Sequence, residues 1–420
     1  MDGMRRWGGP WIWSLLVIAA VMRFWHLGYP AEKVFDETHY VFAASVMAGL
    51  EPPTGLEAWK NSDYPIIART PDPNFSHPPL GKALIVASIK AFGNTPWAWR
   101  FPSAVASIVS LILIYLIARR LTRDDWVAWL ATFFMCFDMM HVCQSRIAML
   151  DMFLLVAALM LMGSVLLLIE DPKSKWGNAG AVLAIGIGLS TKFTMVLTIS
   201  AFGLAYMVLG RNHNWWKRMF HAGALAVAGA LVFSLWAFYF MANGFTWLEW
   251  AFLQWVAVVK VLGPLKSHPY SSLPIAWPFN HKPVWYYYKG GDMPEGIVAL
   301  GNPVLWWGFL WAAYVLLVER RLYKGLAPTY LLIWYSVTYL PLILVLWRRS
   351  DASFLFHMLP STPPMMIGLA YALVREVRDR RWHVAFCGLA LGVFGFFAPV
   401  VFAVPASGDY YRLLSNLISF

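Results

Sequence analysis

Long apolar runs separated by short polar connections recur along almost the whole chain. A helix needs about 20 predominantly apolar residues to cross a bilayer, and eleven runs approach or reach that length. The pattern therefore predicts an all-α polytopic membrane protein with about eleven transmembrane helices. The predicted spans are residues 9–27, 99–118, 126–143, 148–169, 177–191, 193–210, 219–242, 298–318, 327–347, 354–374 and 383–404.

One further stretch, residues 78–92 (PPLGKALIVASIKAF), is apolar but short, and Lys82 and Lys90 interrupt it. Counting it as a span would invert the orientation of every later helix. We therefore expect an interfacial or re-entrant helix that lies on the outer face of the membrane.

Basic residues cluster in alternate connections between the runs, and this asymmetry predicts orientation, because cytoplasmic loops carry the excess of Lys and Arg. With eleven spans, all clusters fall on one side, so the N-terminus is predicted to be cytoplasmic and the C-terminus outside. The clusters are Arg5/Arg6, Arg119/Arg120/Arg123, Lys173/Lys175, Arg211/Lys217/Arg218, Arg320/Arg321/Lys324 and Arg375/Arg378/Arg380/Arg381.

This topology places two long loops outside, residues 28–98 and 243–297. The chain then divides into three parts. Residues 1–242 form a transmembrane module that includes the first loop, residues 243–297 form the second loop, and residues 298–420 form a C-terminal four-helix region. Long outer loops with short inner turns are typical of a protein that works on its outer face.

Composition supports a membrane protein, since 60% of the residues are hydrophobic and only 13% are charged. The net charge of +11 does not indicate nucleic acid binding, because the basic residues lie in short clusters suited to topology signals and anionic lipid. The three cysteines lie in apolar runs without metal-ligand spacing, so we expect buried thiols.

Asp36 and Glu37 form an acidic pair just after the first apolar run, in Phe35-Asp36-Glu37-Thr38-His39-Tyr40. One interpretation is a helix N-cap with first-turn acids. The other is a general base, because a partly desolvated carboxylate can take a proton from a hydroxyl nucleophile. The sequence alone leaves both open.

Other polar residues are predicted on the same side of the membrane. The cations are candidates for binding a phosphate, although lipid contact or a structural ion pair would also explain them. The candidate phosphate ligands are Lys82, Arg146, Lys192, Arg348 and Arg349, and the other candidate site residues are His77, Asp151, His268, Tyr270 and His357.

Several motifs in this order and spacing resemble the protein O-mannosyltransferase family of the GT-C membrane glycosyltransferases. They are FDETHY at 35–40, HPPLGK at 77–82, RFPS at 100–103, SRIAMLD at 145–151, and the block from HPYSS to ALGNPVLWW at 268–307. The resemblance implies the GT-C fold, eleven spans and outer catalytic loops. Asp36 matches the family's catalytic acid, and Arg146 matches the arginine of the SR…LD turn.

The resemblance also implies a polyprenyl-phosphate sugar donor, typically mannose, and a Ser or Thr hydroxyl of a secreted or membrane protein as acceptor. Eukaryotic members carry a MIR domain in the late outer loop, where this chain has only about 55 residues. It therefore resembles a compact prokaryotic member, working on the periplasmic or extracellular side of the plasma (inner) membrane.

In the predicted chemistry, Asp36 acts as base with Glu37 in support, and the cations stabilise the departing phosphate. A single displacement inverts the anomeric centre. No cofactor or metal is required, although the acidic pair could bind a divalent cation.

Three alternatives remain at this stage. The acceptor could be an envelope lipid, as in the related aminoarabinose transferases. A transporter would place charges at the bilayer midplane, where Asp138 is its best support. A membrane scaffold would explain the interfacial tryptophans but not the outer acids and cations.

Overall fold

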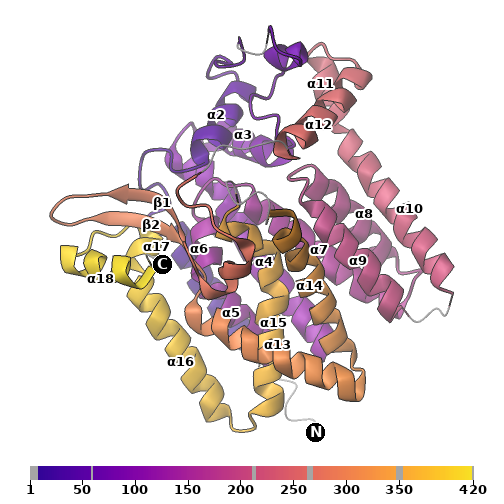
Figure 1. The fold of residues 1–420 in the computed structure, drawn as a ribbon, viewed down its shortest axis with the longest axis vertical. Helices are drawn as coiled ribbons and strands as arrows, with labels where there is room; N and C mark the ends of the chain where they lie inside the picture. The colour runs from indigo at the N-terminus through magenta and orange to yellow at the C-terminus, as the bar shows by residue number, and fades with distance from the viewer. Residues whose placement is uncertain (1–7, 58–59, 211–213, 263–267, 347–352, 419–420) are drawn as a thin grey trace.

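The computed structural model describes residues 8–57, 60–210, 214–262, 268–346 and 353–418, and these residues are mostly helical. Long helices lie side by side and form the body of the molecule (Figure 1). The N-terminal segment lies at one end of this body, and α2 (Glu37–Met47), α3 (Leu80–Phe92) and α12 (Trp247–Leu262) lie at the other.

A helix, or a broken pair of helices, occupies every run predicted as a span, because each run is long enough to bury an apolar helical face. They are α1 (Gly8–Phe24), α4 (Pro96–Thr122), α5 (Asp125–Cys136) with α6 (Met139–Ser145), α7 (Asp151–Glu170), α8 (Lys175–Leu189), α9 (Met195–Leu209), α10 (Trp215–Ser234) with α11 (Trp236–Ala242), α13 (Pro303–Tyr323), α14 (Leu326–Leu346), α15 (Thr362–Glu376), and α16 (Arg380–Phe397) with α17 (Pro399–Phe402).

Within the described chain, four of these helical segments are long and apolar enough by themselves to cross a membrane: Pro96–Thr122, Asp151–Glu170, Trp215–Ala242 and Leu326–Leu344. A fifth is added if α5 and α6, bent by 62° at their junction, form one span. Of the apolar window of α7, 78% is buried, against 22% for α10 and α11, so α7 lies at the centre of the bundle and α10 at its periphery.

The break between α5 and α6 is caused by Asp138, whose side chain caps α6 by accepting from the His141 amide at 3.2 Å. The same carboxylate accepts from the Trp306 indole at 2.5 Å and from the Asn302 amide at 3.3 Å. Asp138 therefore joins the first half of the bundle to α13, a structural role that its position in an apolar run did not reveal.

The predicted loop 28–98 contains α2, the short helix η3 (Pro65–Arg69) and α3, which confirms a short helix within residues 78–92. The predicted loop 243–297 holds more regular structure than we expected: α12, η4 (Pro274–Phe279), and strands β1 (Val284–Lys289) and β2 (Glu295–Ala299). Two more short helices follow, η6 (Leu355–Ser361) and α18 (Gly408–Ile418). The hairpin departs from a purely helical fold.

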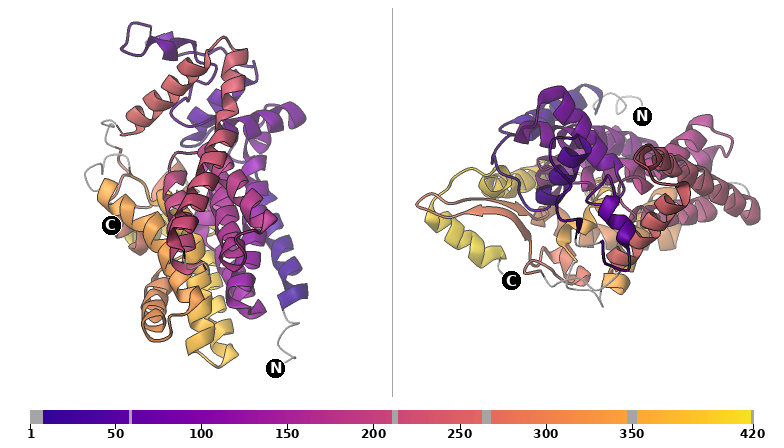
Figure 2. Two further views of the ribbon diagram at one scale, coloured as in Figure 1. Left: turned by 90° about the vertical axis from the view of Figure 1, so that its right-hand side faces the viewer. Right: turned by 90° about the horizontal axis from the view of Figure 1, so that it is seen from above.

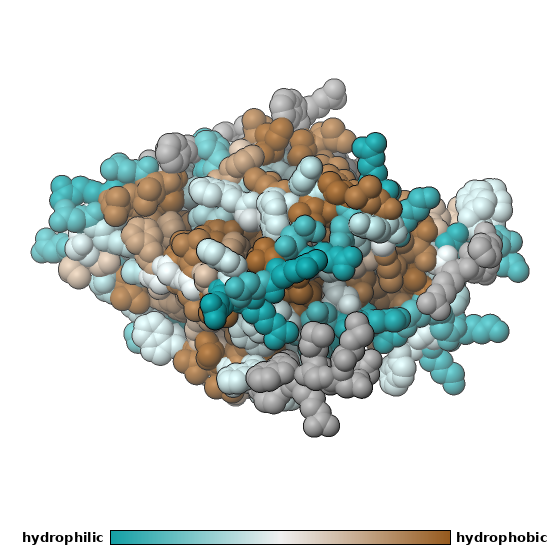
Figure 3. Space-filling view, turned by 90° about the horizontal axis from the view of Figure 1, so that it is seen from below, coloured by the Kyte–Doolittle hydropathy of each residue, from teal (hydrophilic) through white to brown (hydrophobic). Residues whose placement is uncertain are grey.

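The connections predicted to lie inside can be checked by asking whether they lie at the same end of the molecule as the start of α1. The α13–α14 and α15–α16 connections, which contain Lys324 and Arg378, lie at this end, away from α2 and α12 (Figures 1 and 2). Seen from this end, hydrophilic residues cross the middle of the surface between apolar flanks (Figure 3). Arg5, Arg6 and Arg211 lie outside the described residues.

Candidate active site

Asp36 occupies the N-cap position of α2, but its side chain makes no capping hydrogen bond. The preceding Phe35 has a φ of 48°, so the chain turns sharply just before the helix. Among the residues that the structure describes, none donates a hydrogen bond to the partly buried Asp36 carboxylate. The N-cap interpretation therefore fails for this side chain, and both of its oxygens can accept a proton.

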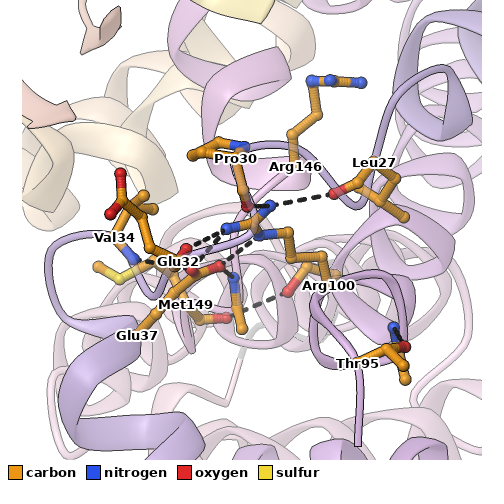
Figure 4. A network of polar contacts seen from close by, with 12 residues as sticks. Leu27, Pro30, Glu32, Val34, Glu37, Thr95, Arg100, Arg146 and Met149 are labelled. Carbon is orange, nitrogen blue, oxygen red and sulfur yellow. Dashed lines mark hydrogen bonds and ion pairs between the residues drawn. The ribbon is translucent and has the colours of Figure 1, made fainter. Parts of the chain in front are cut away.

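Glu37 is fully buried and its carboxylate is saturated (Figure 4). Arg100 binds it in a bidentate manner, with Nε 2.8 Å from Oε1 and an Nη 2.9 Å from Oε2. The Ala148 amide donates to Oε1 at 2.7 Å, and the Val34 amide donates to Oε2 at 3.0 Å. Four donors fill the capacity of a carboxylate, so Glu37 holds structure together and is not available to a substrate.

Arg100 ties the start of the first loop to the bundle. Beyond Glu37, its guanidinium donates to the carbonyls of Leu27 at 3.2 Å, Pro30 at 2.8 Å and Glu32 at 3.1 Å (Figure 4). The backbone on either side of Asp36 is thereby fixed to α4 and to the α6–α7 turn. Sequence reasoning noticed the RFPS motif but gave Arg100 no role, because its partners lie 63 to 73 residues away.

Asp151 and Lys192 form a buried ion pair at the base of the site. The Lys192 Nζ lies 3.0 Å and 2.8 Å from the two Asp151 oxygens, where α7 begins and where the chain breaks between α8 and α9. An ammonium has three donors. Within the described residues, Asp151 takes two of them, which leaves one N–H for an anion.

Electrostatics connect Asp36 to this pair. Burial raises the pKa of the Asp36 carboxyl above its ordinary value, and the positive charge of Lys192 is the largest opposing influence. His39 and His268 also lower the pKa of Asp36, whereas Asp151 raises it. Asp151, Lys192 and His268 are therefore close enough to Asp36 for their charges to influence its pKa.

Two histidines at the site are held neutral. Burial, together with the charge of Lys192, lowers the pKa of His77 well below its usual range and that of His357 to about 4. The His77 ring lies 5.8 Å from the Tyr40 ring, and His357 Nδ1 accepts from the Phe354 amide at 3.2 Å. Lys192 is therefore the principal cation beside Asp36 at neutral pH.

Aromatic rings from three separate regions surround Phe35, the neighbour of Asp36. Its ring centroid lies 4.7 Å from Tyr286 of β1, 5.9 Å from His268 and 6.0 Å from Phe356. Tyr270 packs against His268, with 5.5 Å between the two ring centroids. The second loop and η6 thus close around the start of α2, which limits access of water to Asp36.

Lys82 does not face this site with free donors. It is fully buried, forms an ion pair with Asp72, and donates to the carbonyls of Asn74 at 2.6 Å and His77 at 2.7 Å. All three of its N–H groups are used in holding the 72–77 turn, so the structure gives it a positioning role.

Arg146 caps the C-terminus of α1. Its guanidinium donates to the carbonyls of Met22 at 2.9 Å and Trp25 at 2.6 Å, and it stacks 4.8 Å from the Phe402 ring. It points away from Arg100 and Glu37 (Figure 4). Arg348 and Arg349 lie outside the described residues.

The arrangement supports proton abstraction next to an anion. It offers one carboxylate without hydrogen bonds, a lysine with a remaining donor, and neutral histidines in an aromatic enclosure. A base must be unbonded in order to accept a proton, and a leaving phosphate needs a nearby cation. Both requirements meet at Asp36 and Lys192.

Comparisons with known proteins find similar glycosyltransferases. Residues 76–239 match the family model described as dolichyl-phosphate-mannose-protein mannosyltransferase. The polyprenol-phosphate-mannose–protein mannosyltransferase of Mycolicibacterium smegmatis mc(2)155 is 24% identical over 86% of this chain and 80% of its own length. These matches support a GT-C protein O-mannosyltransferase.

One solved structure and a second relative are also similar to this chain. The Saccharomyces cerevisiae Pmt1–Pmt2 complex bound to its sugar donor is similar in fold, with a TM-score of 0.74 at 14% identity, over 96% of this chain and 91% of that one. An undecaprenyl phosphate-α-4-amino-4-deoxy-L-arabinose arabinosyl transferase of Pseudomonas fluorescens Pf0-1 is 25% identical over 98% of this chain and 67% of its own length.

Proposed function

We propose that this protein transfers mannose from a polyprenyl-phosphate donor to Ser or Thr hydroxyls of secreted or membrane proteins. The observation that carries the proposal is the contrast between Asp36, which accepts no hydrogen bond from the described residues, and the saturated Glu37 beside it. Relatives named as polyprenol-phosphate-mannose–protein mannosyltransferases support the choice of donor and acceptor.

In the proposed reaction, the acceptor hydroxyl gives its proton to Asp36 while its oxygen attacks the anomeric carbon of the donor. The bond from that carbon to the phosphate oxygen breaks, and its electron pair leaves with the lipid phosphate. Lys192 stabilises the departing charge through its remaining N–H. A phosphate is already a good leaving group, so no general acid is required. One displacement inverts the anomeric centre.

The finer topology belongs to the same proposal. Eleven spans, a cytoplasmic N-terminus and an outer C-terminus would put residues 28–98 and 243–297 on the periplasmic or extracellular side of the plasma membrane. Residues 1–242 would then form the catalytic module, and residues 298–420 would complete the bundle. The gathering of α2, α3 and α12 at the end opposite the N-terminal segment supports this arrangement (Figure 2).

The test is mannosyl transfer in membranes supplied with polyprenyl-phosphate mannose and a Ser/Thr peptide. Removal of a general base typically costs 10²- to 10⁴-fold, so we expect Asp36→Asn to lose roughly 100-fold or more in kcat. Glu32→Gln, an exposed carboxylate in the same loop, is the matched control and keeps wild-type activity. Transfer by Asp36→Asn at the wild-type rate, with equal expression, would refute the assignment.

The second candidate is transfer to an envelope lipid. It is favoured by the similarity, over nearly the whole chain, to the aminoarabinose transferase of Pseudomonas fluorescens. Mass spectrometry of envelope lipids and of glycoproteins from a deletion strain separates the two. Loss of sugar from the proteins supports the mannosyltransferase, and loss from the lipids alone supports this alternative.

A further inference from the structure

The hairpin of the second loop presents one covered strand and one open strand. β1 and β2 pair antiparallel from Val284 opposite Ala299 to Lys289 opposite Glu295, with an irregularity between Trp285 and Tyr287. Every residue of β2 is buried, and this strand packs against α6 and α17. β1 becomes exposed toward its end, where 56% of the Tyr288 side chain is accessible.

The outer edge of β1 carries backbone groups without partners. In the described part of the chain, no backbone N–H or C=O of Val284–Lys289 bonds to a backbone other than that of β2. On an edge strand, alternate residues direct these groups away from the sheet, where they form a template for another extended chain. In Figure 1, β1 forms the side of the hairpin that faces the region of α2, and β2 faces α17.

β1 also lies close to the segment that carries Asp36, the candidate base. Tyr286 of β1 lies 4.7 Å from the ring of Phe35, whose neighbour is Asp36. The hairpin is fixed to the first loop at its other end, because the Tyr29 hydroxyl contacts both oxygens of the buried Glu295 carboxylate at 2.6 Å. The Tyr287 hydroxyl donates to Glu295 at 2.7 Å. The edge of β1 is therefore held in a defined position relative to Asp36.

We propose that an acceptor polypeptide binds the outer edge of β1 as an added antiparallel or parallel strand, which brings a Ser or Thr to Asp36. The inference rests on the proposed function, since it specifies how that function's acceptor is held. An added strand is recognised through main-chain hydrogen bonds, which every sequence can make, while side chains add selectivity. An enzyme whose acceptors share only a hydroxyl residue needs recognition of this kind.

The experiment uses the full-length protein and a set of Thr peptides, each N-methylated at a single backbone position. Methylation removes one donor and leaves the side chains unchanged. We expect KM to rise several-fold at every second position on one side of the Thr, with the intervening positions as internal controls and kcat nearly constant. A flat profile, or one that follows side-chain identity alone, would overturn strand addition.

A second readout does not depend on activity. Under a mild added oxidant in detergent, Tyr288→Cys should form a disulfide with a Cys-containing acceptor peptide, whereas Tyr323→Cys, at the end of α13 and even more accessible with 71% exposure, should not. The three native cysteines are buried and do not interfere. If no peptide is mannosylated, the proposed function fails. If peptides are mannosylated but neither alternation nor cross-linking appears, only the inference about β1 fails.

Discussion

At the scale of single residues, the acidic dipeptide shows how neighbours in sequence acquire opposite roles. Helix geometry directs successive side chains to different faces, so the charge of Lys192 acts on Asp36 while Glu37 pairs with Arg100. The buried pair fixes the backbone, and this allows the adjacent carboxylate to remain without hydrogen bonds. Asp36, the proposed base, is thus positioned by a neighbour whose own carboxylate is fully hydrogen-bonded.

This division predicts a stability defect for Glu37→Gln. Removing one partner from a buried ion pair leaves an uncompensated charge, which costs about 3–5 kcal/mol. The control is Lys33→Met, which breaks the partly exposed pair with Glu51 at 3.6 Å and costs less than about 1 kcal/mol. Thermal unfolding of the purified variants in detergent measures both. An unfolding temperature for Glu37→Gln equal to that of the wild type would contradict a structural role.

Asp36 predicts the opposite effect on stability. Its pKa is raised on folding, chiefly by burial, so its contribution to stability is fully present below the unfolded pKa and is lost as pH rises through the folded pKa. Asp36→Asn removes this penalty, and at neutral pH we expect the variant to unfold at a higher temperature than the wild type. The difference should shrink as pH falls below the raised pKa. A destabilised variant at neutral pH would show that the carboxylate has a structural partner.

The binding partners of isolated lysines and arginines were the feature that the sequence predicted least well. Lys82 and Arg146 were expected to bind phosphate, yet the structure shows Lys82 held by Asp72 and Arg146 held by carbonyls of α1. The Arg146 partners lie about 120 residues earlier in the chain. No local pattern encodes such a contact, because a charge near a helix end looks the same in sequence whether it binds backbone or substrate.

At the scale of elements, α8 and α10 approach closely through small residues. A methyl group on Gly229 of α10 would lie 2.4 Å and 2.5 Å from the side chain of Ile185 and 3.1 Å from the Val182 carbonyl. Helices in membranes associate through such contacts, since lipid supplies no hydrophobic drive between them. The close packing of α8 against α10 therefore depends on the absence of a Cβ atom at Gly229.

Gly229→Ala should destabilise the protein by about 1–3 kcal/mol, because the added methyl overpacks a contact between two helices. Gly223→Ala, on the same helix with nothing within 4 Å of the added carbon, is the matched control. It should be neutral or stabilising by up to about 1 kcal/mol, as expected for replacing glycine in a helix. Equal unfolding temperatures for the two variants would show that α8 can move away from α10 without cost.

Elements that contain a long apolar run could be predicted from the sequence, whereas elements without such a run could not. Each predicted span became a helix, because a long apolar run has to form its hydrogen bonds internally. The hairpin was missed, since β1 is a six-residue aromatic stretch in a proline-rich loop. Its pairing depends on β2 and on the Tyr29–Glu295 contact, 266 residues apart in sequence. The site is built largely from such distant contacts.

At the scale of the whole molecule, orientation in the membrane decides which compartment the site serves. The positive clusters predict that the connection at residues 171–174 is cytoplasmic and that the β1–β2 hairpin is outside. The long axis of the bundle, with the N-terminal segment at one end and α12 at the other, allows both assignments to hold at once (Figure 2).

Lys173→Cys and Asp292→Cys test this orientation, because both positions are exposed and the native cysteines are buried. A membrane-impermeant maleimide applied to intact cells, or to spheroplasts where an outer membrane is present, should label Asp292→Cys directly. Lys173→Cys should react only after the membrane is permeabilised. The reverse pattern would place Asp36 in the cytoplasm, where the proposed acceptors do not occur. Labelling of both positions in intact cells would mean that the number of spans between them is even, so that α8, α9 or the α10–α11 pair would have to be counted differently.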